Sequence, residues 1–235
     1  MARTALVTGA TDGVGRVVAG ALGKAGWRVL VHGRDHTRGE AVAGEIAKAG
    51  IGTAGGNPGR QVSADGHELR FAVNYLAGFL LTYELLPLLK ASAPSRIVNV
   101  SSAGQQAIDF ADVMLTRQYS GVAAYCQSKL AQIMFTIDLA RELNGSGVIV
   151  NSLHPSTYMN ITMVRRAGVS PMSKVETGAE AILQLAVSPK LEGRSGLYFN
   201  VMTEARANPQ AYDAEARAKL RAISLDLTGA DDRLR

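Results

Sequence analysis

The chain has 235 residues, of which 47% are apolar and 19% charged, a balance typical of a globular protein with a sizeable core. Its formal net charge of +5 comes from basic residues spread along the chain, which argues against a nucleic-acid-binding surface. The single cysteine, Cys126, excludes an internal disulfide and a thiolate metal cluster, so we expect a cytoplasmic protein without a metal. The apolar run at the N-terminus is too short for a signal peptide.

Short β-branched segments alternate with helical patterns along the chain. In order, the sequence predicts the strand TALVTG, a helix near 15–25, the strand WRVLVHG, a helix near 37–48, a long helix ending at Lys90, the strand RIVNVSS, a helix around 124–143, the strand VIVNSLH, a helix near 175–188, the strand GLYFN and a helix near 209–228. This alternation predicts an α/β fold, a single three-layer Rossmann-type domain over 1–235 with a doubly wound parallel sheet. Asn74, Glu84 and Pro87 interrupt the most apolar segment, which favours a buried helix over a membrane span.

A glycine-rich turn, TGATDGVG, joins the first strand to the first helix. Its glycines let the backbone turn sharply, and the helix behind it offers unpaired N–H groups and the positive end of its dipole to a pyrophosphate. Packing alone would also explain glycines, but their place between a first strand and a helix favours phosphate binding. The predicted cofactor contacts in this turn are Gly9, Thr11, Asp12, Gly13, Val14 and Gly15.

The end of the second strand carries Gly33 and Arg34 where an acidic residue would bind a ribose 2′-hydroxyl. A guanidinium at this place favours a 2′-phosphate, and therefore NADP(H) over NAD(H). The alternative is a solvated surface arginine whose charge Asp35 or Asp12 neutralises.

The motif YCQSK places Tyr125 and Lys129 four residues apart on one helix face. The strand RIVNVSS ends in Ser101 and Ser102 at the carboxyl edge of the predicted sheet, where open α/β sheets bind ligands. Asn74 interrupts an apolar helix face and needs a buried partner or water. A phenol with an ordinary pKa of about 10 needs a nearby cation to act as a base, and Lys129 is the only cation near Tyr125 on that face.

These motifs resemble the short-chain dehydrogenase/reductase family, and within it the retinol-dehydrogenase-like branch. The matching segments, in the order of the family, are TGATDGVG, HGRD, FAVNYLAG, RIVNVSSAG, YCQSK and NSLHPSTYM. The resemblance implies that Tyr125 exchanges a proton with the substrate and that Ser102 hydrogen-bonds the substrate oxygen. It also implies that Lys129 holds the nicotinamide ribose and lowers the pKa of Tyr125, and that Asn74 anchors a water in the proton relay.

Three other side chains near this motif receive no chemical role. Tyr119 lacks a lysine four residues on, so we expect it to line the rim of the site. Ser101 is expected to turn toward the backbone, although an error of one position between the two serines is an open alternative. Cys126 is expected to pack as a small apolar residue, because nothing places a base beside it.

The segment 155–174 is expected to form the wall and lid over the nicotinamide and the substrate. Pro155 and Thr157 are the predicted cofactor contacts, Ser156 stands where the family usually has glycine, and His154 is expected to be structural. The apolar residues here either line a pocket for a hydrophobic alcohol or ketone or pack the lid on the core. They are Tyr158, Met159, Met163, Val164 and Met172.

The chain lacks a part of the family between Gly50 and Ile51. In the family, a third strand, a crossover helix and a fourth strand follow the helix that ends near Lys48, and these elements amount to about 40 residues at usual lengths. The fourth family strand lies beside the first, so its loss leaves two strand edges with unpaired N–H and C=O groups. Three explanations of the missing segment are open: residues omitted from the numbered chain, a deletion in the gene, or engineered removal. A Cα distance of about 3.8 Å between Gly50 and Ile51 would exclude an omission.

Two functions follow from these features. The first is an NADP(H)-dependent oxidoreductase that moves a hydride between the nicotinamide and a small hydrophobic alcohol or carbonyl compound. The alternative is a catalytically impaired NADP-binding or partner-binding relative, whereas a bare flavodoxin-like nucleotide module is disfavoured by the joint spacing of Ser102, Tyr125 and Lys129. We expect no nucleic-acid or membrane partner, and a homodimer or homotetramer, since the apolar helices near Asn74 and Tyr125 resemble the family's dimer faces.

Overall fold

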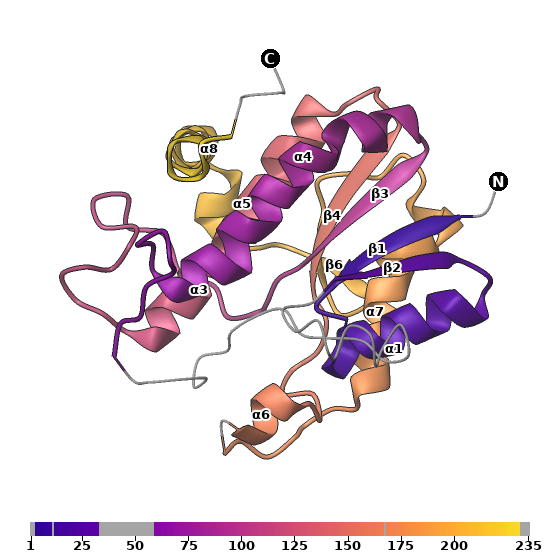
Figure 1. The fold of residues 1–235 in the computed structure, drawn as a ribbon, viewed down its shortest axis with the longest axis horizontal. Helices are drawn as coiled ribbons and strands as arrows, with labels where there is room; N and C mark the ends of the chain where they lie inside the picture. The colour runs from indigo at the N-terminus through magenta and orange to yellow at the C-terminus, as the bar shows by residue number, and fades with distance from the viewer. Residues whose placement is uncertain (1–2, 11, 33–58, 167, 231–235) are drawn as a thin grey trace.

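A computed structural model describes residues 3–10, 12–32, 59–166 and 168–230 of the chain (Figure 1). Three predicted features lie outside the described residues: the helix near 37–48, the pair Gly33 and Arg34, and the junction between Gly50 and Ile51.

The strands form two separate sheets. Strands β1 (Thr4–Thr8) and β2 (Arg28–His32) pair in parallel, with Leu6 opposite Leu30. The second sheet has the order β3-β4-β5-β6 and contains β3 (Ser95–Val100), β4 (Val148–His154), β5 (Tyr198–Asn200) and β6 (Thr203–Ala205). Its first three strands are parallel, as predicted, and β6 is an antiparallel addition after a tight turn that the sequence pattern did not predict.

Helices cover both faces of the sheet that contains β3 and β4, as the alternating pattern predicted, whereas β1 and β2 pack mainly on α1. One layer contains α1 (Gly13–Lys24) and α7 (Val175–Val187), which pack on each other and share one buried apolar cluster. The other layer is one long continuous helical segment beside a second helix, α5 (Gly121–Glu142). The long segment is made of α3 (Leu69–Phe71), the π-helix η1 (Ala72–Leu76) and α4 (Ala77–Ala91). Short elements complete the chain: α6 (Thr162–Arg166), which the sequence did not predict, and the 3-10 helices η2 (Pro189–Leu191) and η3 (Pro209–Tyr212).

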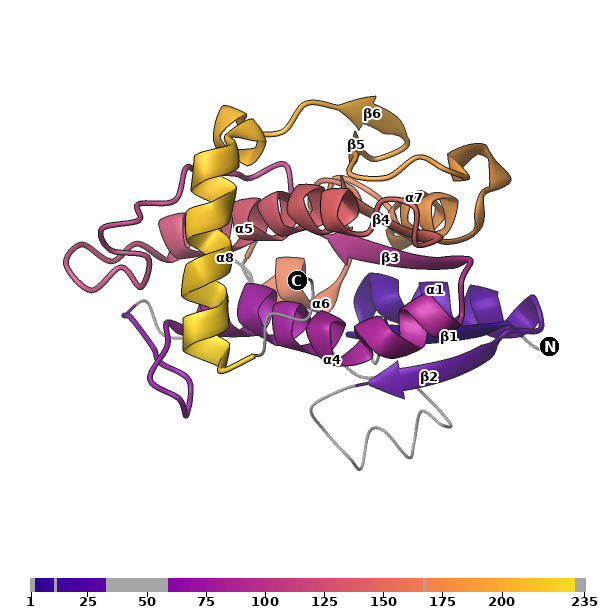
Figure 2. The same ribbon diagram turned by 90° about the horizontal axis from the view of Figure 1, so that it is seen from above.

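The last helix, α8 (Ala214–Thr228), lies across α5 and α4, as Figure 2 shows from above. The Tyr75 hydroxyl hydrogen-bonds the Ser224 hydroxyl at 2.8 Å, and the guanidinium groups of Arg217 and Arg221 lie 3.7 and 3.8 Å from the Asp138 carboxylate. The predicted tail helix is therefore present, divided into η3 and α8. It covers part of the apolar face that the sequence assigned to dimerisation, so the oligomeric state stays a prediction.

One helical stretch among the described residues, Leu69–Ala91, is long and apolar enough to cross a membrane by length and composition. A core helix of a soluble protein passes the same test, and the aromatic contacts of this one are internal. The Phe79 ring stacks on Tyr83 at 4.5 Å between centroids and lies 5.0 Å from the ring of Phe135 on α5. Phe79 and Tyr83 are each only 1% exposed, whereas Leu88 is 63% exposed and 39% of the apolar stretch is buried, so the predicted buried helix is covered on one face.

The break between β1 and β3 leaves the β1–β2 pair poorly covered. Leu6 and Leu30 are 40% and 44% exposed, whereas Val150 and Leu153 in β4 are completely buried. No hydrogen-bonded pairing joins β1 to β3 in the described part of the chain. This is the arrangement expected when the strand that would lie between them is missing, and isolated two-stranded sheets are marginally stable.

Hydrogen exchange measured by mass spectrometry should therefore separate the two sheets. We expect the amides of β1 and β2 to exchange on the order of 100-fold faster than those of β3 and β4, because a small two-stranded unit opens locally. Equal protection of the two sheets would contradict this expectation and show that they unfold as one unit.

Candidate active site

The glycine-rich turn after β1 has the geometry of an anion cradle. Gly9 and Gly13 have φ of 67° and 57°, values that favour glycine. A Cβ on Gly15 would lie 2.2 Å from the carbonyl oxygen of Gly9, so this position has no room for a side chain. The Asp12 carboxylate accepts a hydrogen bond from the Gly13 N–H at 2.7 Å and caps α1. The residues of the turn thus fit a pyrophosphate, which the N-terminus of α1 would attract. Of the predicted contacts, Thr11 lies outside the described residues.

The second group of predicted residues meets where β3 ends beside α5. Ser101 and Ser102 follow β3 and are 4% and 9% exposed. The Ser101 hydroxyl donates to the main-chain carbonyl of Lys129 at 2.6 Å, which confirms the expectation that Ser101 turns toward the backbone. The Ser102 side chain instead hydrogen-bonds the Tyr125 side chain, and its hydroxyl oxygen accepts from the Gly104 N–H at 3.1 Å. The serine–tyrosine pair predicted from the sequence is therefore assembled, with Ser102 as its serine.

Burial dominates the electrostatics of Tyr125. It raises the pKa of the phenol above its ordinary value, and the hydrogen bond with Ser102 opposes that rise. Lys129 was expected to lower this pKa, but its ammonium is 5.8 Å from the centre of the Tyr125 ring and is engaged elsewhere. In this structure it is Ser102 that favours the phenolate.

The Lys129 ammonium is held from two sides. It donates to the main-chain carbonyl of Val100 and to the Gln132 side-chain oxygen, both at 2.9 Å. Burial lowers the pKa of Lys129 to about 8, so the group is still mainly a cation at neutral pH. Gln132 was not singled out from the sequence, although its place one turn after Lys129 is the signal that would have indicated it.

Asn74 lies in the π-helix η1 and is 5% exposed. Its side-chain amide donates to the Ser128 hydroxyl at 3.1 Å, and that hydroxyl donates to the main-chain carbonyl of Tyr125 at 2.7 Å. The buried partner that the sequence required for Asn74 is therefore found on α5, next to the motif. Single-turn π-helices often occur at functional sites, and this one directs a polar side chain out of an apolar helix.

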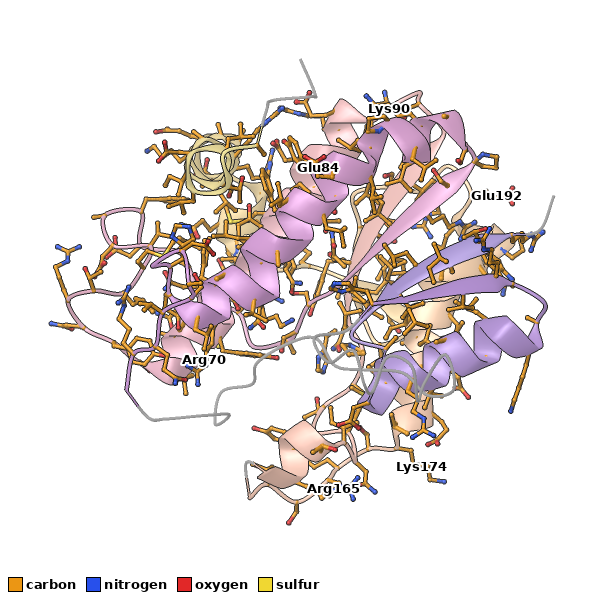
Figure 3. All side chains as sticks on the ribbon, viewed as in Figure 1. Arg70, Glu84, Lys90, Arg165, Lys174 and Glu192 are labelled. Atoms are coloured by element: carbon orange, nitrogen blue, oxygen red, sulfur yellow. The ribbon has the colours of Figure 1, made fainter. Side chains whose placement is uncertain are left out.

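Tyr119 belongs to a different cluster. Its hydroxyl accepts a hydrogen bond from Arg70, labelled in Figure 3 at the start of α3, and donates to the Glu68 carboxylate at 3.3 Å. Glu68 in turn accepts from the Phe71 N–H at 2.7 Å. The Tyr119 hydroxyl thus helps to hold the loop before α5 to the N-terminal end of α3, away from the pair Ser102 and Tyr125. Cys126 is half-buried, and burial raises the pKa of its thiol, as a packing role predicts.

The predicted lid lies over the glycine-rich turn. Ile161 approaches within 3.1 Å of the position of a Cβ on Gly13, and Met159 and Val14 of α1 both lie against Gly178 of α7. Met159 and Val164 are buried, whereas Tyr158 is 49% and Met172 is 73% exposed. Of these apolar lid residues, two therefore pack on the core and two are exposed to solvent. The side chain of Met163 lies outside the described residues.

The remaining predicted residues of the lid follow β4. Pro155 is buried. Thr157 is exposed and shares a hydrogen bond of 3.1 Å with the His154 ring. The Ser156 hydroxyl donates to Ser173 at 2.8 Å, so the serine that replaces the usual glycine ties the two ends of the lid together. Figure 3 labels Arg165, on α6, and Lys174, just before α7, at the lower edge of the view.

Comparisons with known proteins agree with this fold and site. Residues 3–55 and 46–168 match the family model of short chain dehydrogenases, and the chain therefore belongs to the short-chain dehydrogenase family of oxidoreductases. Members of this family bind a nicotinamide cofactor, NAD or NADP, and act on alcohol or carbonyl substrates. The chain is similar to human retinol dehydrogenase 13, with 34% identity over 97% of this chain and 85% of the relative. It is equally similar to mouse retinol dehydrogenase 14, with 34% identity over 97% of this chain and 86% of the relative.

Solved structures show the same fold. An uncharacterized protein from Mycobacterium Paratuberculosis superposes with a TM-score of 0.75 at 26% identity, covering 97% of this chain and 94% of its own. The 3-ketoacyl-(acyl-carrier-protein) reductase of Brucella melitensis, solved with NADH, superposes with a TM-score of 0.61 at 22% identity over 85% of this chain and 96% of its own.

The match with human retinol dehydrogenase 13 also measures the missing segment. It spans 283 positions, but 97% of 235 residues is about 228, so about 55 of those positions have no residue in this chain. The two segments that match the family model both include residues 46–55, which surround the junction between Gly50 and Ile51. About 55 unmatched positions are enough to contain the roughly 40 residues that element lengths predicted.

Proposed function

We propose that this protein is an NADP(H)-dependent oxidoreductase that interconverts a hydrophobic alcohol and the corresponding carbonyl compound. The observation that carries the proposal is the assembly of Ser102, Tyr125 and Lys129 at the carboxyl end of β3, beside a glycine-rich turn with no room for a side chain at Gly15. The retinol dehydrogenases to which the chain is similar support a hydrophobic substrate. The preference for NADP(H) over NAD(H) rests on Arg34 in the sequence. A cytoplasmic location, supported by the single cysteine, is part of the proposal.

The roles of the residues follow from their contacts. The cofactor, when bound, supplies a hydride to the carbonyl carbon in reduction. Tyr125 gives its hydroxyl proton to the carbonyl oxygen, and Ser102, already bonded to Tyr125, donates to the same oxygen and orients it. The hydrogen bond from Ser102 stabilises the phenolate that forms on Tyr125, and the Lys129 cation, 5.8 Å from the centre of the ring, adds a weaker long-range attraction. Lys129 would also hold the nicotinamide ribose, and Asn74 holds the helix turn behind Tyr125 through Ser128. The glycine-rich turn, Pro155 and Thr157 would hold the cofactor.

The test is an assay of the purified chain with acetophenone, cyclohexanone and decanal, each with NADPH and with NADH, and with the matching alcohols in the reverse direction. The proposal expects turnover of at least one hydrophobic compound and a higher kcat/KM with NADPH. Turnover with NADH alone would overturn the cofactor assignment, and NADPH binding without any turnover would overturn the enzymatic one.

A second candidate function is a catalytically impaired NADP-binding or partner-binding relative. The observation that favours it is the division of the strands into two sheets, because the cofactor would bind at the edge where they separate. Titration of NADPH fluorescence distinguishes the candidates. Absence of binding would support loss of the cofactor site, and tight binding with turnover would exclude this alternative.

The pH dependence of reduction should follow Lys129. Its cation is fully present well below its pKa of about 8 and is lost as the pH rises through that value. Tyr125 stays a protonated donor over the same range, because burial raises its pKa. We therefore expect kcat for reduction to be constant from about pH 6 to about pH 7.5 and to fall above about pH 8. A profile that stays flat to about pH 10 would contradict a role for the Lys129 charge.

A further inference from the structure

The Ser102 carbonyl accepts two side-chain hydrogen bonds, one from a distant strand and one from its own loop. The Tyr198 hydroxyl, on β5, donates to it at 3.1 Å, and the Gln105 side-chain amide donates at 3.0 Å. A carbonyl oxygen has two lone pairs, so both of its acceptor sites are filled. Ser102 lies just past the end of β3, and these two bonds hold its main chain where the strand pairing stops.

Because the Ser102 carbonyl is held in place, the Ser102 side chain, which would face the substrate, is held in place as well. The carbonyl and the hydroxyl of Ser102 are attached to the same Cα, and the hydroxyl oxygen also accepts from the Gly104 N–H. The orientation of the Ser102 backbone therefore decides whether its hydroxyl meets Tyr125. Displacements of about 1 Å at such a group reduce rates strongly, because catalysis depends on near-ideal alignment.

Tyr198 occupies a core position where phenylalanine would satisfy the packing. It is 5% exposed and belongs to the apolar cluster of α4 and α5, while its neighbour Phe199 belongs to the cluster on the other face. Its hydroxyl is the one group that packing does not require. Burial raises the pKa of Tyr198 to about 12, so the hydroxyl stays a donor at any pH at which the protein works.

Gln105 also hydrogen-bonds the C-terminal part of the chain. Its side-chain oxygen accepts from the Asn208 N–H at 2.7 Å. Two residues on, the Gln210 side chain accepts from the Ile108 N–H at 2.7 Å and donates to the Ile108 carbonyl at 3.1 Å. The loop after β3 is thus joined by side chains to the segment just before α8.

We propose that Tyr198 and Gln105 are positioning residues, which hold Ser102 in register with Tyr125. The proposal rests on the proposed function, because it assigns Ser102 to the substrate oxygen. Neither residue touches the reacting atoms, and both act through the Ser102 main chain.

The test compares Tyr198→Phe with Tyr212→Phe. The control also removes a tyrosine hydroxyl from this region, but that hydroxyl accepts from the Ala207 N–H and not from a group of Ser102. We expect Tyr198→Phe to lower kcat for the best carbonyl substrate of the panel about fivefold, the effect of one hydrogen bond, with the Kd for NADPH unchanged within about twofold. Tyr212→Phe should leave kcat unchanged. Equal kcat for wild type and Tyr198→Phe, or equal losses in both variants, would overturn the proposal.

A second measurement does not depend on turnover. The phenolate absorbance of Tyr125 is obtained as the difference between each protein and the same protein with Tyr125→Phe, titrated with base. Because the Ser102 hydrogen bond lowers the pKa of Tyr125, its loss in Tyr198→Phe should raise the midpoint, and Tyr212→Phe should not change it. An unchanged midpoint in Tyr198→Phe would overturn the positioning role, whereas absence of turnover in the wild type would count against the proposed function alone.

Discussion

Replacing Tyr125 by phenylalanine is expected to lower kcat for reduction by about 100- to 10,000-fold, the usual contribution of a general acid. The substitution removes the hydroxyl that the Ser102 side chain hydrogen-bonds and leaves the ring in place. Lys129 keeps its bonds to Val100 and Gln132, and the glycine-rich turn is untouched, so the Kd for NADPH should stay within about twofold. Steady-state kinetics and NADPH fluorescence titration measure the two quantities separately.

Tyr119→Phe is the matched control for this experiment. Tyr119 lies six residues earlier and hydrogen-bonds Arg70 and Glu68, so its hydroxyl is removed without touching Ser102. We expect at most a small loss of stability and an unchanged kcat. Retained turnover in Tyr125→Phe, or equal losses in both variants, would refute the assignment of Tyr125 as the proton donor.

The sequence was sufficient to predict most of this site because its parts are local. A strand that ends in two serines, a helix with Tyr125 and Lys129 four residues apart, and a glycine-rich turn are each fixed by short-range geometry. The choice between Ser101 and Ser102 was open in the sequence, since neighbouring residues leave a strand end in opposite directions. The structure decides it, because the Ser101 hydroxyl bonds the Lys129 carbonyl.

What the sequence did not predict depends on contacts between distant segments. Tyr198 lies 96 residues after Ser102, and no periodicity in GLYFN indicates that its hydroxyl reaches a catalytic loop. The strand β6 has three residues and depends on pairing with β5, so its own sequence is too short for an alternating pattern that would predict a strand. The weak influence of Lys129 on Tyr125 was also not foreseeable, because it depends on the engagement of the ammonium by Val100 and Gln132.

The missing segment was predictable for a different reason. The family order of elements made the absence visible in the sequence, and the physical consequence, two unpaired strand edges, follows from the position of the fourth family strand beside the first. The structure shows the result as two sheets. The residues of the chemistry lie on β3 and α5, on one side of the break, and the glycine-rich turn follows β1 on the other. Cofactor binding is therefore the step that most directly reports whether the two sides are held in register.

Gly15→Ala is expected to weaken NADPH binding by at least about 100-fold. The new Cβ would lie 2.2 Å from the Gly9 carbonyl oxygen, 2.9 Å from the Gly9 carbonyl carbon and 3.1 Å from the Cα of Ala10. All three atoms are main chain, so no side chain can move aside, and the turn itself must open. An open turn no longer directs the N–H groups at the N-terminus of α1 toward one anion. The Kd for NADPH, from fluorescence titration, is the direct measure.

Gly20→Ala on the same helix is the matched control. A Cβ at Gly20 meets no atom within 4 Å, and alanine is favoured over glycine inside a helix by about 1 kcal/mol. This variant should bind NADPH as the wild type does and melt at an equal or higher temperature. If Gly15→Ala also bound NADPH normally, the cofactor would have to bind elsewhere, and the glycine-rich turn would then be no more than a packing feature. A loss confined to Gly15→Ala would instead show that the glycine-rich turn after β1 forms a working half of the cofactor site, although no strand of the described residues pairs β1 with β3.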